Sequence, residues 1–476
     1  MRLRFNIQYP IFKMGGYALI PVIVFASIAV SMLTSLAGWA GLNIRLSREA
    51  ESREQALQIA EAGIEYYRWH LAHAPTDFKD GTGGEGPYIH PFYDKDGIRL
   101  GEFQLTITAP PIGSTVGTIR SEGRVDTVSN LYRTIEAKMA ISSLAKYSVV
   151  ANDAMRFGSG TEIFGPVHSN GGVRFDGLSH NVVTSALSSY DDPDHTGGNE
   201  FGVHTHISPT DPLPPSATPN RPDVFMAGRQ FPVPAYDFVG LTSDLSSIKS
   251  SAQSGGRYFA SSGALGYRIL LKTNDTFDLY RVNNLRSVPN GCSSSGQSGW
   301  GTWSVGTAGN SQTLIGNYVF PANGLVFVED HLWVEGQIAG ARLTVASGKF
   351  PASASTWTSI TVNNDILYTT KDGSDVLSLI AQNNFNVGLY SDDNLEIDAA
   401  LVAQNGRVGR YYYGSSCSSN YIRSALPLYG MIATSQRYGF AYTDGTGYQT
   451  RNLNYDANLL YGPPPSFPLT TDQYTI

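Results

Sequence analysis

Two adjacent carboxylates, Asp392 and Asp393, come nearest to a catalytic pair in this sequence. Polysaccharide-cleaving enzymes use two acids, one as the general acid and the other as base or nucleophile. Here the pair stands in Tyr390-Ser391-Asp392-Asp393-Asn394, a typical turn sequence, and no set of His or Arg accompanies it. We therefore expect a structural turn and no catalytic residue. A polysaccharide-active enzyme remains the alternative.

Carboxylates and imidazoles between residues 191 and 206 form a second group of candidate ligands. The acids could offer oxygen ligands to Ca²⁺, but the spaced loop with its distal Glu is missing. Two of the histidines alternate, so they would share one strand face and could bind Zn²⁺, but no further ligand has a convincing spacing. We expect a solvated loop that binds no metal and no cofactor. The candidate residues are Asp191, Asp192, Asp194, His195, His204 and His206.

The two cysteines, Cys292 and Cys417, both stand in Ser- and Gly-rich text that reads as loop. In an exported protein they could form one disulfide, which would close a long loop. The alternative is two unpaired thiols that lie too far apart, and two cysteines alone do not make a zinc site. The sequence shows no nucleophile elbow, phosphate loop or dinucleotide fingerprint.

The element that must position everything else is a long helix near the amino terminus. Residues 14–44 contain no charged side chain, and a membrane span needs about 20 mainly apolar residues. We expect a helix over residues 17–74, with a transmembrane part at 17–42 and an amphipathic part at 46–74 that stops before Pro75. The spacing in the second part predicts one buried face, made of Leu46, Ala50, Arg53, Leu57, Ala60, Ile64, Tyr67 and Leu71.

The segment Lys13-Met14-Gly15-Gly16-Tyr17-Ala18-Leu19-Ile20 resembles the type III signal of type IV pilins and type II secretion pseudopilins. Residues 58–65, Gln-Ile-Ala-Glu-Ala-Gly-Ile-Glu, resemble the matching helix of larger minor pilins. The resemblance implies that residues 1–16 are a leader, which a prepilin peptidase removes between Gly16 and Tyr17, or between Gly15 and Gly16. An ordinary signal-anchor helix is the alternative.

One position departs from the family pattern. Pilins usually carry Glu at the fifth mature position, where it meets the amino terminus of a neighbouring subunit. With Tyr17 as first residue, that position is Pro21, which has neither a carboxylate nor an N–H. Family members without this Glu tend to be minor subunits at or near a filament tip. The resemblance therefore implies a minor, tip-located pilin or pseudopilin-like subunit.

The remaining text predicts a mostly β chain of the α+β class. The helix should pack on a small antiparallel sheet, followed by a large all-β body. Leu379-Ile380-Ala381-Gln382 and Leu401-Val402-Ala403-Gln404 are near repeats, which favours a parallel β-solenoid; a β-sandwich is the alternative. The expected segments are a sheet head at 76–145, the start of the body at 146–187, a Pro/Asp/His-rich loop insertion at 188–236, an inserted subdomain at 237–320, solenoid-like coils at 321–440 and an extended Pro-rich tail at 441–476.

Composition and charge restrict the partners. The formal net charge is −7 and only 15% of residues are charged, which disfavours nucleic acid because phosphate binding depends on Lys and Arg. The basic leader before the span favours a cytoplasmic amino terminus, a single pass through the cytoplasmic membrane and an exported body. The resemblance to pilins further implies a place on a cell-surface filament. The implied partners are the membrane, other pilin subunits, the prepilin peptidase and a surface or glycan ligand for adhesion. A surface-anchored binding protein outside any filament is the last alternative.

Overall fold

The computed structural model describes residues 19–111, 114–128, 130–141, 143–238, 240–294, 296–469 and 474. The chain forms two compact units. The first, called the head, comprises Met1–Thr108 and Thr118–Lys138. The second, called the body, comprises Ala109–Gly117 and Met139–Ile476.

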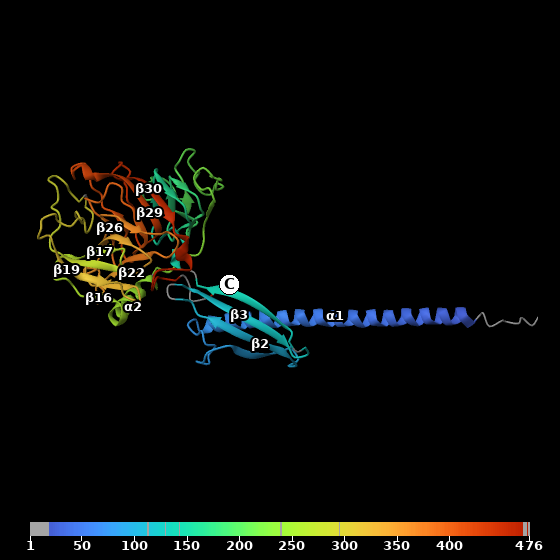
Figure 1. Cartoon of the computed structure of the whole chain (residues 1–476). Helices are drawn as coiled ribbons and strands as arrows, with labels where there is room; N and C mark the ends of the chain where they lie inside the picture. Colours follow the sequence, from blue (N-terminus) through green and yellow to red (C-terminus); the bar gives the residue numbers. More distant parts are fainter. Residues whose placement is uncertain are drawn as a thin grey trace, which may run out of the picture. The chain divides into compact units, whose positions relative to one another are not determined.

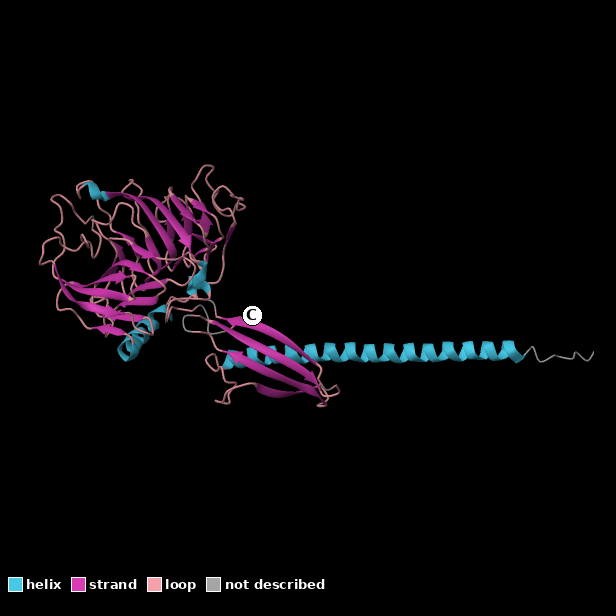
Figure 2. Cartoon of the chain, viewed as in Figure 1, coloured by secondary structure: helices cyan, strands magenta, loops and turns pink. Residues whose placement is uncertain are grey.

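The head consists of one long helix, α1 (Leu19–His73), and a four-stranded sheet in the order β1-β2-β3-β4 (Figures 1 and 2). The strands are β1 (Tyr88–Tyr93), β2 (Arg99–Thr108), β3 (Val116–Val125) and β4 (Tyr132–Ala140). Neighbouring strands are antiparallel, as the pairings β1–β2 and β2–β3 show. The predicted pilin-like arrangement, a long helix packed on a small antiparallel sheet, is confirmed.

The buried face of α1 is shorter than the periodicity predicts. Burial begins at Ser52 and ends at Leu71, and all residues from Leu19 to Glu51 are exposed. The prediction is right for Ala60, Ile64, Tyr67 and Leu71, but Leu46, Ala50 and Arg53 are exposed. The physical reason is length. Ten-residue strands span about 34 Å, and the helix from Ser52 to Leu71 spans about 30 Å, so the sheet ends before it reaches Leu46.

Strand β1 lies in a segment that reads as a Gly- and Asp-rich connection. Its sequence contains Pro91, which cannot donate a hydrogen bond to a neighbouring strand. The position is tolerated because β1 is at the edge of the sheet and pairs only with β2 among the described strands.

The body is built mainly from short strands that pair in parallel with strands from other turns of the chain, whereas neighbouring strands between residues 189 and 201 and between residues 266 and 319 pair antiparallel. Its first part contains β5 (Val149–Ala151), β6 (Met155–Phe157), β7 (Thr161–Ile163), β8 (Val167–Ser169), β9 (Val173–Phe175), β10 (Leu178–Ser179), β11 (Val183–Ser185), β12 (Ser189–Tyr190), β13 (Glu200–Phe201), β14 (Val203–His204) and β15 (Arg229–Gln230). Its middle part contains α2 (Gly240–Gly255), β16 (Arg257–Phe259), β17 (Gly266–Lys272), β18 (Thr276–Val282), β19 (Gln312–Val319), β20 (Leu325–Val328), β21 (Leu332–Ile338) and β22 (Arg342–Ser347). Its last part contains β23 (Ile360–Thr361), β24 (Ile366–Tyr368), β25 (Val376–Ala381), β26 (Phe385–Val387), β27 (Ile397–Ala403), β28 (Val408–Arg410), β29 (Ile422–Thr434) and β30 (Gly447–Tyr455).

The near repeat in the sequence is a neighbour pair in the structure. Leu379 of β25 lies opposite Leu401 of β27, and Ala381 lies opposite Ala403. The same register continues through the stack and lines up one column of buried aliphatic side chains: Val326, Val345, Leu379, Leu401, Ile432, Val149, Val167 and Val183. A β-sandwich is made of antiparallel sheets, so the parallel alternative is the one that the body adopts.

The order of strands in this column is not the order of the sequence. β29, near the end of the described chain, pairs on one side with β27 and on the other with β5, near the start of the body. In Figure 1 the red strands β29 and β30 accordingly lie beside the green ones. The chain therefore builds one half of the stack from β5 to β15, starts again at β16, and joins the two halves with β29 and β30.

Strands of the column are buried on both faces. Alternate residues of β27, such as Leu401 and Val402, belong to two different hydrophobic clusters. The first cluster fills the inside of the stack. The second includes Leu245 and Ile248 of α2 and Phe467 of the tail, so the helix and the tail cover the other face. Burial on both faces explains why β25 and β27 read as continuous apolar runs and not as alternating ones.

Candidate functional site

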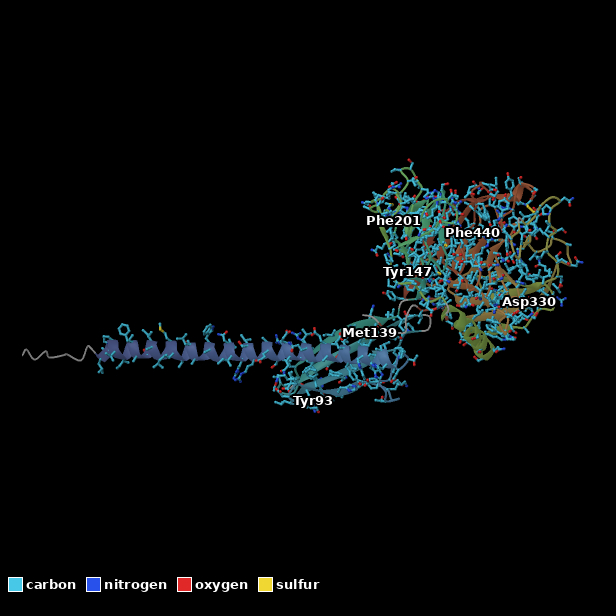
Figure 3. The ribbon with its side chains drawn as sticks, turned by 180° about the vertical axis from the view of Figure 1, so that it is seen from behind. Tyr93, Met139, Tyr147, Phe201, Asp330 and Phe440 are labelled. Carbon is cyan, nitrogen blue, oxygen red and sulfur yellow. A yellow bond between two sulfur atoms is a disulfide. The ribbon has the colours of Figure 1, made fainter. Side chains whose placement is uncertain are left out.

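The surface with the clearest functional signal is the first part of α1. Among the described residues, α1 is the one helix long and apolar enough to cross a membrane, judged by length and composition. Its large side chains are exposed, with Phe25 at 72% and Trp39 at 66% of their full accessible area. Figure 3 shows side chains standing out on all sides of this part of the helix. So much exposed apolar surface requires an apolar environment or a partner.

Polar side chains in this part of α1 are satisfied by the helix itself. The hydroxyl groups of Ser27, Ser31 and Ser35 donate to backbone carbonyls three or four residues earlier, at 2.8 Å each. Thr34 does the same with Val30 and Ser31, at 2.9 Å. In hydrocarbon there is no water to take such bonds, so internal bonding is what a membrane-embedded helix needs.

The second part of α1 rests directly on the sheet because two glycines remove side chains from the contact. A Cβ added to Gly123 of β3 would lie 2.2 Å from the carbonyl oxygen of Ala56 and 2.5 Å from the amide nitrogen of Ala60. A Cβ added to Gly63 of α1 would lie 2.3 Å from Ser121 Oγ and 2.9 Å from the Phe103 ring. The missing side chain of Gly123 lets β3 contact the backbone of α1 directly, and the missing side chain of Gly63 makes room for Ser121 and Phe103 against α1.

Asp77 fixes the end of α1 to the loop that follows it. Its carboxylate accepts hydrogen bonds from the backbone N–H groups of Lys79 (2.8 Å) and Gly81 (2.6 Å), and lies 3.0 Å from His70 Nε2. The bond from Lys79 is the main reason why the pKa of Asp77 is lowered from its ordinary value, with Gly81 and His70 acting in the same direction. The hydroxyl of Tyr67 donates to the Asp77 carbonyl at 2.8 Å.

The processing residues Gly15, Gly16 and Tyr17 lie outside the described residues. Pro21 is described, as an exposed residue within α1.

Cys292 and Cys417 form a disulfide, with Cα atoms 4.5 Å apart. Aromatic side chains surround it, and the Trp300 indole donates to the Tyr412 carbonyl at 3.1 Å. Tyr411 and Tyr413 are 3% and 1% exposed, so these two rings pack in the interior and do not form a binding surface. The bridge and the rings together join the loop after β18 to the loop after β28.

Asp392 and Asp393 have the contacts of a structural turn. The carboxylate of Asp393 accepts from the Ser424 hydroxyl (2.5 Å) and backbone N–H (3.1 Å), which lowers the pKa of Asp393. The backbone N–H of Asp392 donates to the Asn363 carbonyl at 2.8 Å. Burial raises the pKa of Asp392, and the nearby Asp365 carboxylate adds to this effect. Asp393 therefore joins one coil to the next through Ser424.

The candidate metal ligands divide into two sets. Asp192, His204 and His206 come together, as do His195, His206 and Glu200, the last of which the sequence analysis did not single out. Asp194 instead forms ion pairs with Arg156 and Arg437, and Asp191 is exposed. Glu200 lies five residues after His195, but in a segment that reads as loop such a spacing does not predict that two side chains lie close together.

That segment, residues 188–236, is less loop-like than its composition suggests. It contributes β12 to β15, and β14 and β15 pair with β9 and β11 of the stack. Asp211 accepts hydrogen bonds from Arg229 and from the Thr205 backbone, which holds the Pro-rich part against the strands. In this segment buried ion pairs such as Asp211–Arg229 hold the chain against the strands, whereas periodic apolar residues do so in other segments.

A polar cleft of about 950 Å³ opens beside Asp194 and His206, two of the candidate metal ligands. Its lining is rich in arginine and aspartate and includes His206, Asp176, Asp194 and Tyr442. Burial alone would raise the pKa of Asp194, but the Arg437 and Arg156 guanidinium groups outweigh it and the pKa is lowered. Mixed charge and hydrogen-bonding groups suit a polar ligand more than an apolar one.

No protein-family model matches the sequence, and no curated protein matches it. Among solved structures, the chain is similar to the crystal structure of the competence-associated pilin ComZ from Thermus thermophilus. The sequence identity is 12%, and the match covers 90% of this chain and 97% of that chain with a TM-score of 0.27. With a TM-score of 0.27, this similarity supports no inference about function, and the function is inferred from the residues of the chain itself.

Proposed function

We propose that this chain is a minor, tip-located subunit of a type IV pilus or a type II secretion-like filament. Before assembly the first part of α1 spans the cytoplasmic membrane, and in the filament it packs among the same helices of other subunits. The body is carried outside the cell. The observation that carries the proposal is the division of α1 at Ser52, with an exposed apolar part before it and a part packed on an antiparallel sheet after it.

The exposed part of α1 suits both environments in turn. It is long enough for a bilayer and keeps its hydroxyl groups bonded internally. Helices that meet in hydrocarbon associate through small residues and close packing, and Ser27, Ser31 and Ser35 recur at four-residue spacing on one face. The part of α1 after Ser52 then holds the four-stranded sheet of the head at a fixed place on the helix.

Two features support a minor role. Pro21 cannot supply the carboxylate expected at the fifth mature position, and the body is far larger than the head. A bulky body suits a filament end, where it meets few neighbours. The polar cleft beside Asp194 suits a surface glycan or another polar ligand, through which the body would serve adhesion.

The test is the mature amino terminus of the exported chain, determined by mass spectrometry. A chain that begins at Tyr17, or at Gly16, supports the proposal. In the first case Gly16→Leu should keep the leader, and in the second case Gly15→Leu should keep it. Gly84→Leu is the matched control, because Gly84 lies far from the cut. An amino terminus at Met1, or a cut beyond residue 44, contradicts it.

Fractionation separates the remaining alternatives. A filament subunit should appear in sheared surface filaments. A processed chain that stays in the membrane fraction alone would instead be a surface-anchored binding protein. Cleavage of a glycan by the purified chain, lost on Asp392→Asn with Asp393→Asn, would establish the enzyme alternative.

A further inference from the structure

A buried group of ionisable side chains lies at the β12–β13 hairpin of the body. Tyr190 of β12 is opposite Glu200 of β13, and the connection between them carries Asp192 and His195. β14 follows at once and brings in His204. Asp192, Glu200 and His204 are only 3%, 4% and 1% exposed, so these three side chains are shielded from water, whereas the His195 side chain is 40% exposed.

His204 has no hydrogen-bond partner at either ring nitrogen among the described residues. The nearest carboxylate oxygen, Oδ2 of Asp192, lies 3.6 Å from its Nε2, which is beyond hydrogen-bonding distance. Buried polar atoms are almost always satisfied, because leaving one unpaired costs free energy. An imidazole with two free nitrogens in this position indicates a ligand that binds between the side chains.

The spacing of the group fits a metal ion better than a hydrogen bond. Zn²⁺ binds imidazole nitrogen and carboxylate oxygen at about 2.0–2.2 Å in a tetrahedron, which places ligand atoms about 3.3–3.6 Å apart. The 3.6 Å between His204 and Asp192 falls at this spacing. The ligand atoms of Asp192, His204 and His206 all lie within 4.8 Å of one another, so small side-chain movements would complete the set.

We propose that Asp192, His204 and His206 bind one divalent transition-metal ion, for which Zn²⁺ is the best match. Two imidazoles with a carboxylate favour such an ion over Ca²⁺, which takes oxygen ligands. Three protein ligands leave a fourth position for water.

The surrounding residues position these ligands. Oδ1 of Asp176 accepts from the His206 backbone N–H at 2.8 Å. Glu200 accepts from His195 at 2.6 Å and lies 3.7 Å from His206 Nε2. Arg174 contacts Asp192 at 3.3 Å and Asp176 at 2.7 Å; its charge opposes a metal, but three carboxylates outweigh one guanidinium. His206 lines the polar cleft, which gives an ion a path from solvent.

The test is metal binding by the full, untagged chain in detergent, stripped with a chelator and dialysed. Titration with Zn²⁺, followed by calorimetry and elemental analysis, should give one equivalent per chain. His204→Ala and His206→Ala should each weaken the affinity at least about 100-fold, and His195→Ala about 10-fold, as expected for a residue that supports a ligand. His180→Ala is the matched control, because His180 pairs with Glu162 elsewhere in the body.

His204 is buried, so His204→Ala could fail to fold; His206→Ala, on a side chain with 15% exposure, keeps the test decisive. Co²⁺ gives a second measurement, since nitrogen and carboxylate ligands in a tetrahedron produce a visible absorption band. The proposal is overturned if the wild-type chain binds less than about 0.1 equivalent, or if the two ligand variants bind as tightly as His180→Ala.

Discussion

Gly123 of β3 lies against Ala56 of α1 so closely that a single added carbon atom would come within 2.2 Å of the Ala56 carbonyl oxygen. The helix backbone, and not its side chains, therefore sets the distance between α1 and the sheet at this point. The head depends on a residue that has no side chain to contribute.

The first prediction is that Gly123→Ala destabilises the head. The added methyl group must push α1 away from β3, and overpacking of this kind costs about 1–3 kcal/mol. Hydrogen exchange should rise at the amides from Ser52 to Leu71, and calorimetry should show a lower melting temperature for the head. Gly84→Ala is the control, since a Cβ there has only Thr82 Oγ1 nearby, at 3.8 Å. Equal behaviour of the two variants would contradict the close-contact argument.

The second prediction concerns pH and Asp77. The pKa of Asp77 is lower in the folded head than in the unfolded chain, where it is about 4. Its ionised form therefore stabilises the head above about pH 5, and this contribution is lost as pH falls through 4 and then through the lowered folded value. Asp77→Asn should lower the melting temperature at pH 7 and have a smaller effect at pH 2. A difference that stays constant with pH would show that the charge is unimportant.

The third prediction is that the two cysteines act as one unit. Cys292→Ser, Cys417→Ser and the double variant should destabilise the body equally, because each removes the same bond. Loss of a native disulfide typically costs about 2–5 kcal/mol. Limited proteolysis should become faster in the loops after β18 and β28. A double variant much less stable than either single one would mean that the thiols have separate roles.

The fourth prediction tests the join between the two halves of the stack. Ile432 of β29 is fully buried between Leu401 of β27 and Val149 of β5. Ile432→Ala should cost about 2–5 kcal/mol, the usual range for such a truncation in a core. Ile422→Ala, at the exposed start of the same strand, should cost little. Denaturant unfolding of both variants provides the comparison.

Local patterns predicted the elements whose burial follows a simple period. The near repeat at residues 379–382 and 401–404 is in register, and Ala60, Ile64, Tyr67 and Leu71 of α1 are buried as expected. In each case the signal is the burial pattern of one continuous segment, which sequence spacing records directly.

Features that depend on distant segments left no such record. The pairing of β29 with β5 joins residues far apart in the chain, and no repeat spacing points to it. The start of the buried face of α1 was predicted too early, at Leu46 in place of Ser52, because it depends on the length of the sheet. Glu200 was not among the candidate ligands, because it lies in a segment that reads as loop and whose burial depends on ion pairs such as Asp211–Arg229.

The place of β29 between β27 and β5 also sets the timing of assembly. A chain that crosses a membrane from its amino-terminal side presents β5 to β15 first, but their neighbour on one flank is among the last stretches to emerge. Until then two open half-stacks have unpaired strand edges, which readily join other chains. Premature release of an incomplete polypeptide would therefore leave a product prone to self-association.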